Sequence, residues 1–234
     1  MSLSRRVEPE LLDELKADDP RAVKSRKDLR RINRIMGTCG VIGAAIDPLV
    51  RGKPSARIVE LGAGDGSLLL RLARQKARQW PSVQLDLLDM QPVVRADTLT
   101  AFHDVGWNAR IVGADVFDWL RQEEGGGDPI IVANLFVHHF ESERLQALVQ
   151  GIASRARAFV CCEPRRNRVA LAGSGMLWAL GCNRVTVHDG LLSVRAGFMG
   201  SELTALWPAT PAWRVREDRI GPFVHRFVAV RADA

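Results

Sequence analysis

Three glycines and two acidic residues share one short stretch of the chain, "VELGAGDG". Gly62, Gly64 and Gly66 alternate with other residues, Glu60 precedes them, and Asp65 lies between the last two. Glycines have no Cβ, so the backbone of a tight turn can approach a ligand and adopt positive φ angles. The carboxylates would repel a pyrophosphate but stabilise a positive charge such as an amine or a sulfonium. The stretch therefore predicts a turn that binds a cationic ligand.

Acidic residues also end the next two strand-like runs of the sequence. Asp89 ends "VQLDLLD", where its carboxylate can accept both hydroxyls of a ribose, and Met90 can lie against an adenine face. Asp115 ends "ARIVGAD", where it can accept from the adenine amino group while the N–H of Val116 donates to the ring. These residues predict an adenosine site. Either carboxylate could instead serve only as the N-cap of the helix that follows it.

The elements that position these residues alternate between strands and helices. Strand-like runs occupy residues 57–61, 83–89, 109–115, 129–136 and 158–164, and helical stretches occupy 67–79, 92–105, 116–124 and 141–157. This alternation predicts a parallel sheet with helices on both faces. Two last strand-like runs, 213–218 and 223–231, predict a closing hairpin. Ligands of such sheets bind beyond the carboxyl ends of the strands, where the glycine turn and the two acidic residues lie.

Two segments lie outside this alternating core. Asp19 and Pro20 predict the start of a basic amphipathic helix that Gly37 ends. After residue 164 a glycine-rich apolar segment leads into "VHDGLLSVRAGF", which we expect to be extended, and a short helix over 201–207. The predicted organisation is a helical cap (1–50), a ligand-binding core (51–164), a lid insertion that binds substrate (165–212) and a strand pair that completes the sheet (213–234).

Four motifs on consecutive strand ends resemble those of class I S-adenosylmethionine-dependent methyltransferases. "VELGAGDG" resembles their glycine motif, "LLDMQP" their ribose-binding motif, "GADVF" their adenine motif and "IIVANLFVHHF" their fourth-strand motif. The resemblance covers residues 57 to about 164. It implies S-adenosylmethionine as cofactor, S-adenosylhomocysteine as product, and Asn134 near the methionine moiety, although this asparagine could instead tie down a loop. The implied fold is an α/β, Rossmann-like, doubly wound sheet of seven mostly parallel strands with an antiparallel last strand, helices on both faces and an N-terminal helical cap.

Two places offer a general base, which a methyltransferase needs when the acceptor is a hydroxyl. His138 and His139 end the fourth strand, and in related small-molecule methyltransferases this loop borders the methyl site. His188 is the other candidate, with Asp189 as its orienter, but neighbouring residues of an extended segment point in opposite directions. Each of these histidines could also be purely structural.

The class of methyl acceptor is predicted from the two segments outside the core, the basic helix and the insertion after residue 164. Arg30 and Asn33 lie on the basic helix and could hold an anionic or phenolic substrate, or form a solvated face. Met176 and Trp178 suggest a hydrophobic cover for a lipophilic or aromatic acceptor, or a helix that merely packs. Asp189 is the remaining candidate for substrate binding. By family analogy we expect O-methylation of a small molecule, of the kind found in bacterial secondary metabolism.

Composition narrows the alternatives for this chain of 234 residues with a net charge of +6. The cysteines form no CxxC pair, so we expect neither a disulfide framework nor a bound metal. The [DN]PP[YF] motif and a Pro-Cys nucleophile are absent, and basic-aromatic stacking motifs are lacking, so we do not expect a nucleic-acid partner. A non-catalytic cofactor-binding protein, an RNA methyltransferase and an NAD-type oxidoreductase, which would need GxGxxG, remain as alternatives.

The sequence also bears on where the protein works. Its first residues lack the apolar region of a signal peptide. Its longest uncharged run, residues 169–182, is shorter than the roughly 20 apolar residues that cross a bilayer. We therefore expect a cytoplasmic protein without a transmembrane segment; the sequence leaves its oligomeric state open.

Overall fold

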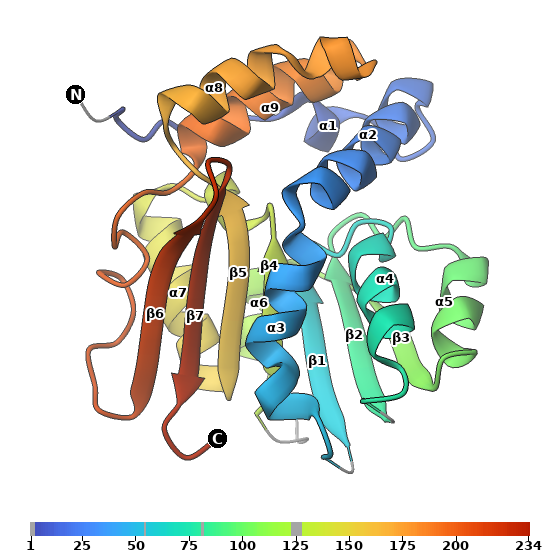
Figure 1. Cartoon of the computed structure of the whole chain (residues 1–234), viewed down its shortest axis with the longest axis vertical. Coiled ribbons are helices and arrows are strands. Elements are labelled where there is room, and N and C mark those ends of the chain that lie inside the picture. Colours follow the sequence, from blue (N-terminus) through green and yellow to red (C-terminus); the bar gives the residue numbers. More distant parts are fainter. Residues whose placement is uncertain (1–2, 54, 81, 123–127) are drawn as a thin grey trace.

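A seven-stranded sheet in the order β3-β2-β1-β4-β5-β7-β6 forms the centre of the computed structural model, which describes residues 3–53, 55–80, 82–122 and 128–234 (Figure 1). The strands are β1 (Ala56–Leu61), β2 (Val83–Asp89), β3 (Trp107–Gly113), β4 (Ile130–Asn134), β5 (Ala158–Pro164), β6 (Trp213–Ile220) and β7 (Val224–Arg231). The first five strands pair in parallel, and β7 is antiparallel to both of its neighbours. The predicted fold class is therefore confirmed.

Helices cover both faces of the sheet. Figure 1 shows α3 (Thr38–Val50), α4 (Ser67–Lys76) and α5 (Ala96–His103) in front of it, and α6 (Val116–Arg121) and α7 (Ser142–Arg155) behind it. Each face has its own apolar cluster, because successive side chains of a strand point to opposite faces. Ile58 of β1 belongs to the cluster under α3 and α4, whereas Val59 and Leu61 belong to the cluster under α6 and α7.

A cap lies over the carboxyl ends of the parallel strands. It consists of α1 (Leu11–Glu14), α2 (Pro20–Met36), α8 (Arg168–Gly175), the 3-10 helix η2 (Leu177–Leu180) and α9 (Arg184–Ala196) (Figure 1). The segment before α1 runs along α9, where the backbone N–H of Arg6 donates to the carbonyl of Arg195 at 3.1 Å. The N-terminal part and the insertion after β5 therefore share one layer, while the predicted domain boundaries stay a prediction. No helix among the described residues has the length and apolar character that a membrane span requires.

The helix α2 begins and ends as predicted, but α3 was not predicted. The Asp19 side chain accepts from the backbone N–H of Arg21, and Gly37 ends the helix at φ 69°. The glycines of α3 obscure its helical pattern, yet they serve its packing. A Cβ on Gly43 would lie 2.6 Å from Cδ1 of Leu72 on α4, so glycine allows these two helices to approach each other.

Two predictions about the segment after β5 are wrong. Residues 184–196 form helix α9 rather than an extended segment: the Asn183 side chain accepts from the N–H of Thr186 at 2.8 Å, and this cap outweighs the β-branched character of the first turn. Residues 201–206 form turns rather than a helix. The third strand also ends earlier than predicted, at Gly113. Helix α6 also ends earlier than predicted, at Arg121, and the glycines 125–127 that were predicted to end it lie outside the described residues.

Candidate active site

A cavity of about 460 Å³ lies beneath the cap at the carboxyl ends of the strands. It brings together most of the predicted site residues. Those that line it are Arg30, Asn33, Glu60, Gly62, Gly64, Asp89, Met90, Asp115, Val116, Asn134, His138 and His139. Gly66, Met176, Trp178, His188 and Asp189 do not line it.

The glycines of the turn after β1 have different physical roles. All three have positive φ, but a Cβ on Gly62 would lie 2.4 Å from Cδ2 of Phe136, so this glycine makes room for a side chain. Gly64 has no atom within 4 Å of the place where a Cβ would be, and it lines the cavity. Gly66 faces Leu87 instead, at 3.3 Å. Of the three glycines, Gly62 and Gly64 line the cavity and Gly66 does not.

Asp89 is fixed at the end of β2 by two backbone groups. Its Oδ2 accepts from the N–H of Gly64 and its Oδ1 from the N–H of Gln91, both at 2.8 Å. Each carboxylate oxygen can accept a second hydrogen bond, so this contact orients the carboxylate without using up its capacity. Met90, beside it, is 68% exposed and covers part of the cavity wall.

Asp115 makes the helix cap that was the alternative interpretation of this residue. Its Oδ1 accepts from the N–H of Phe117 at 2.7 Å and of Asp118 at 3.3 Å, at the start of α6. It lies two residues beyond the end of β3, and it still lines the cavity together with Val116. Capping therefore orients Asp115 at the cavity wall.

Two buried acceptor atoms at the cavity have no hydrogen-bond partner within the described part of the chain. They are Oε2 of Glu60, at the end of β1, and Oδ1 of Asn134, at the end of the neighbouring strand β4. Burial, followed by the charges of Asp65 and Asp89, raises the pKa of Glu60 well above its usual value. An unpartnered buried polar group costs about 1–3 kcal/mol, so a ligand with donor groups would stabilise both.

A strained turn carries the two histidines that follow β4. Leu135 has φ 54°, an unusual conformation for a residue with a side chain, and the 3-10 helix η1 (Val137–His139) comes next. Nδ1 of His138 lies 2.6 Å from Oε2 of the fully buried Glu163 on β5. Nδ1 of His139 lies 2.9 Å from the carbonyl oxygen of Phe136. Both rings are thus held through Nδ1, which leaves Nε2 as the nitrogen directed away from these anchors.

Glu10 of the N-terminal segment meets both rings. Its Oε1 lies 3.3 Å from Nε2 of His138 and its Oε2 3.4 Å from Nε2 of His139, while the Ser193 hydroxyl donates to Oε1. Burial disfavours the charged ring of His139, but Glu10 outweighs it and raises the pKa of His139 to about 9. Burial likewise disfavours the Glu10 carboxylate, yet hydrogen bonds to the two histidines hold its pKa well below the usual range.

The other candidate base lies outside this cavity. Nδ1 of His188 is 3.0 Å from Oδ1 of Asp189, a contact that the expected extended segment disfavoured and the helix α9 permits. Asp189 mainly serves the N-terminal segment: its carboxylate accepts from the backbone N–H groups of Leu11 at 2.9 Å and Leu12 at 3.0 Å. It therefore fixes α1, directly after Glu10.

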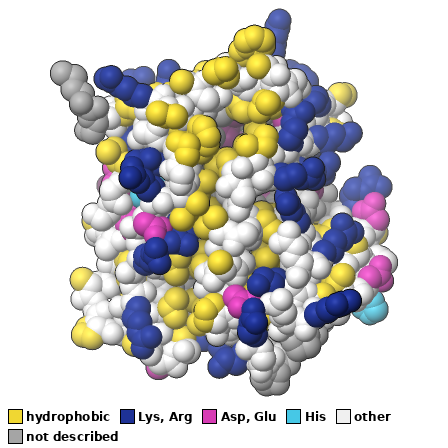
Figure 2. All heavy atoms as spheres, viewed as in Figure 1, with side chains coloured by type: hydrophobic (Ala, Val, Ile, Leu, Met, Phe, Trp, Pro, Cys, Tyr) yellow, Lys and Arg dark blue, Asp and Glu magenta, His cyan; other side chains and the backbone are white. Residues whose placement is uncertain are grey.

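Two apolar residues of the insertion that were predicted to bind substrate are exposed. Met176 is 62% exposed and Trp178 is 67% exposed. Figure 2 shows hydrophobic side chains gathered over the top of the cap, where α8 and η2 lie in Figure 1. The cavity walls do not include Met176 and Trp178, and the contact of these two residues with a substrate stays a prediction.

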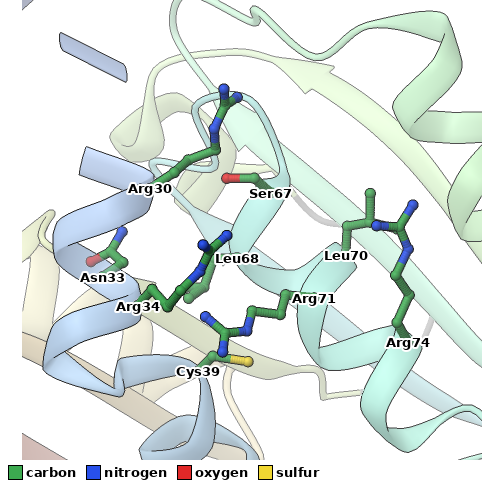
Figure 3. Close-up of a pocket in the computed structure, with 9 residues that line it drawn as sticks. All are labelled: Arg30, Asn33, Arg34, Cys39, Ser67, Leu68, Leu70, Arg71 and Arg74. Atoms are coloured by element: carbon green, nitrogen blue, oxygen red, sulfur yellow. The ribbon is translucent and has the colours of Figure 1, made fainter. Parts of the chain in front are cut away.

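A basic groove adjoins the cavity between α2 and α4. It shares Arg30 and Asn33 with the cavity and contains three more arginines, Arg34, Arg71 and Arg74 (Figure 3). Figure 3 shows the side chains of Arg34 and Arg71 between the two helices. Arg30 is paired with Asp65 of the glycine turn, Nη1 to Oδ2 at 2.6 Å, and Asn33 accepts from Nδ2 of Asn134 at 3.1 Å. Helix α2 is therefore joined to the turns after β1 and β4.

Known structures share this architecture. The chain has the fold of class I methyltransferases. An O-methyltransferase family protein from Burkholderia thailandensis matches 92% of this chain with a TM-score of 0.60 and 15% identity, and this chain spans 61% of that protein. The plantazolicin methyltransferase BpumL in complex with SAH matches 92% of this chain and 91% of its own, with a TM-score of 0.64 and 11% identity.

A third structure with the methyltransferase fold extends the comparison. The methyltransferase domain of bacterial CtHen1-C matches 84% of this chain and 97% of its own, with a TM-score of 0.54 and 14% identity. No protein-family model matches the sequence. No curated protein matches it either.

Sequence reasoning missed two residues that contact the histidines after β4, Glu10 and Glu163. Glu10 lies in an acidic N-terminal stretch without a motif, and it meets the histidines only through the packing of the cap on α9. Glu163 stands near the end of β5, one strand away from η1, where it accepts from the N–H of Phe136 at 3.1 Å and of Val137 at 2.9 Å. A glutamate inside an otherwise apolar strand was the available signal for Glu163.

Proposed function

We propose that this chain binds S-adenosylmethionine and transfers its methyl group to a small molecule, with a hydroxyl oxygen as the favoured acceptor. The observation that carries the proposal is the buried Oε2 of Glu60 at the glycine turn, which has no hydrogen-bond partner among the described residues and lines the same cavity as the fixed carboxylate of Asp89. A cavity that presents acceptors at both places suits a ligand with a cationic end and a ribose. It disfavours a pyrophosphate, because negative charges repel each other.

The cofactor would satisfy the unpartnered atoms of the site. Its ammonium group can donate to Oε2 of Glu60 and Oδ1 of Asn134, which have no hydrogen-bond partner among the described residues. Its ribose hydroxyls can donate to Asp89, and its adenine can lie between Met90 and Val116. The SAH-bound plantazolicin methyltransferase, which shares the fold, supports this choice of cofactor.

Methyl transfer to a hydroxyl requires little covalent chemistry from the protein. The acceptor oxygen forms a bond to the methyl carbon as the carbon–sulfur bond breaks, and that electron pair stays on sulfur, giving neutral S-adenosylhomocysteine. The protein must align the two reactants and let the hydroxyl proton leave. The group formed by Glu10, His138 and His139 lines the same cavity and is the proposed place for the acceptor.

The acceptor class and the compartment are further parts of this proposal. Arg30 and Asn33 border both the cavity and the basic groove, which favours an acceptor with an anionic or phenolic group. All four cysteines are free thiols, three of them buried, which suits the reducing conditions of the cytoplasm.

Calorimetric titration of the purified chain with S-adenosylhomocysteine tests the proposal, with NAD as the control ligand. We expect saturable binding of S-adenosylhomocysteine alone. Binding of neither ligand by folded protein that carries no ligand from the expression host would overturn the proposal. Binding without methyl transfer to any of a panel of phenolic and lipophilic acceptors would favour a non-catalytic binding protein.

A further inference from the structure

We propose that Glu10, His138 and His139 bind a divalent transition-metal ion, and that this ion holds an acceptor with two neighbouring oxygen atoms. The ion-binding part stands on the geometry of these residues alone. The part about the acceptor rests on the function proposed above. The sequence predicted no metal site, because Glu10 and the histidines are far apart along the chain.

The distances within this group suit a metal ion. One ligand atom from each of the three side chains lies within 4.8 Å of the others. The carboxylate oxygens of Glu10 are 3.3 Å and 3.4 Å from the two Nε2 atoms. An ion with metal–ligand bonds of about 2.0–2.1 Å separates neighbouring ligand atoms by roughly 3.0–3.4 Å. A modest inward movement of the three groups would therefore complete a coordination site.

Both imidazoles are oriented as metal-binding histidines usually are. In metal sites the nitrogen that does not bind the ion commonly donates to a carboxylate or a backbone carbonyl, which fixes the ring and its tautomer. Here Nδ1 of His138 meets Glu163, and Nδ1 of His139 meets the carbonyl of Phe136. With hydrogen on both Nδ1 atoms, an ion that displaces the Nε2 protons meets two lone pairs directed toward Glu10. A single general base would not require two imidazoles prepared in this way.

Glu163, which holds the ring of His138, is itself fixed by backbone hydrogen bonds. Glu163 is fully buried, and besides the imidazole it accepts from the backbone N–H groups of Phe136 and Val137, at 3.1 Å and 2.9 Å. These bonds fix the direction of its carboxylate and therefore of the ring that it holds. Glu163 is thus a positioning residue in this proposal.

The donor set indicates the class of ion. Two imidazoles and a carboxylate are typical of zinc, manganese and iron(II) sites, whereas magnesium and calcium prefer oxygen ligands alone. Oδ2 of Asp13 lies 3.8 Å from Nε2 of His139, and this side chain is 65% exposed. It can turn toward the ion as a fourth ligand or stay free to accept a proton.

The position of the group indicates what the ion would do. Glu10, His138 and His139 line the same cavity as Gly64 and Asp89, so the ion would lie on the acceptor side of the proposed cofactor. With three protein ligands it keeps open coordination positions, which a vicinal diol, a catechol-like ring or a hydroxy-carbonyl group can fill with two oxygens. A bound cation lowers the pKa of the hydroxyl, whose proton passes to water or Asp13. His139 then acts as a ligand rather than as the base.

The test uses the full chain freed of metal by a chelator and titrated with Zn²⁺ or Mn²⁺ in a calorimeter. We expect one ion per chain. Glu10→Gln and His139→Ala should each weaken binding by at least about tenfold, and Glu163→Gln by about 10–100-fold. His103→Ala, on the exposed surface of α5, is the matched control and should bind as the wild type does.

S-adenosylhomocysteine titrations of the same samples separate the two proposals. If the wild-type protein binds S-adenosylhomocysteine but no metal ion, the metal site is overturned. It is also overturned if Glu10→Gln and His139→Ala both bind the metal ion as tightly as the wild type does. Metal binding without cofactor binding would keep the site and overturn the proposed function. Cobalt substitution gives a second readout: a visible absorption band expected for bound Co²⁺ in the wild type should be lost in Glu10→Gln, whose fold is checked by its melting temperature.

Discussion

Oε2 of Glu10 lies 3.4 Å from Nε2 of His139, which joins the N-terminal segment to the turn after β4 at the wall of the cavity. The position of Glu10 depends on α9, since the Asp189 carboxylate accepts from the backbone N–H groups of Leu11 and Leu12. The cap therefore contributes to the site as well as covering it. It supplies a charged group to the site that the strands build.

Replacing Asp189 by alanine should loosen this part of the cap. Two backbone donors would lose a buried acceptor, which costs about 1–3 kcal/mol. Hydrogen exchange of Leu11 and Leu12 should become faster, while amides of β1 and β4 keep their protection. His188→Ala is the control, because His188 contacts Asp189 without holding α1. Unchanged exchange in Asp189→Ala would show that α1 is held by other contacts.

Asp89→Ala should weaken binding of S-adenosylhomocysteine by about 1–3 kcal/mol, because the ribose hydroxyls and the N–H of Gly64 lose their acceptor. Calorimetric titration measures the change. Asp97→Ala, an exposed residue of α5 that pairs with Arg95, is the matched control and should leave the affinity unchanged. If Asp89→Ala binds as tightly as Asp97→Ala, Asp89 does not contact the cofactor.

The strand ends of this site could be predicted because each depends on a local pattern. Glu60, Asp89 and Asn134 each end a short apolar run, and parallel strands present their carboxyl ends at one edge of the sheet. The group at Glu10 could not be predicted in this way. Its formation depends on the cap, on the unpredicted helix α9 and on Glu163 of another strand. The hydrophobic pattern of a single segment does not predict contacts between segments that are far apart in the sequence.

The insertion is harder to predict. Met176 and Trp178 are apolar and largely exposed on the cap, and their contact with a substrate stays a prediction. Hydropathy indicates that a side chain prefers an apolar neighbour but not which neighbour it finds. Asp115 lines the cavity and also caps α6, because helix capping and ligand binding select the same residue types near a strand end; its contact with the cofactor stays a prediction.

Gly62→Ala should destabilise the protein more than Gly64→Ala. Both positions have positive φ, which costs a residue with a Cβ about 1–2 kcal/mol. At Gly62 the new methyl group would also collide with Phe136, and overpacking adds about 1–3 kcal/mol. Thermal unfolding of the two variants compares them directly. Equal melting temperatures would mean that Phe136 moves away at little cost.

Asp86 should make stability depend on pH in the acid range. Burial disfavours its carboxylate, but Arg110 and Arg57, whose Nη2 atoms each lie 3.0 Å from Oδ2, lower the pKa of Asp86 in the folded protein. Because its pKa is lower in the folded than in the unfolded protein, the Asp86 carboxylate stabilises the fold at every pH above its unfolded pKa of about 3.9. This stabilisation is lost as the pH falls through the folded-state pKa.

The comparison of wild type with Asp86→Asn isolates this effect. Urea unfolding should show a stability difference that is constant above about pH 5 and shrinks below about pH 4. Asp97→Asn, with its exposed ion pair, should show a much smaller difference at every pH. A difference between wild type and Asp86→Asn that is the same at pH 3 and pH 7 would contradict the assignment.

Binding of S-adenosylmethionine should release a proton from Glu60. Burial first, and then Asp65 and Asp89, raise the pKa of this carboxyl in the free chain, so it is protonated up to that raised value. A cationic ligand at Oε2 favours the carboxylate and lowers the pKa again. At a pH between the two values binding therefore expels a proton, and the affinity rises with pH across that interval.

Titrations in buffers of different ionisation enthalpy measure this proton. The observed binding enthalpy of the wild type should change with the buffer, and that of Glu60→Gln should not, because the amide keeps the size of the side chain but cannot ionise. Asp97→Asn, which lies outside the cavity, serves as the control and should release the proton as the wild type does. Equal buffer dependence in wild type and Glu60→Gln would assign the proton to another group and remove Glu60 from contact with the cationic end of the cofactor.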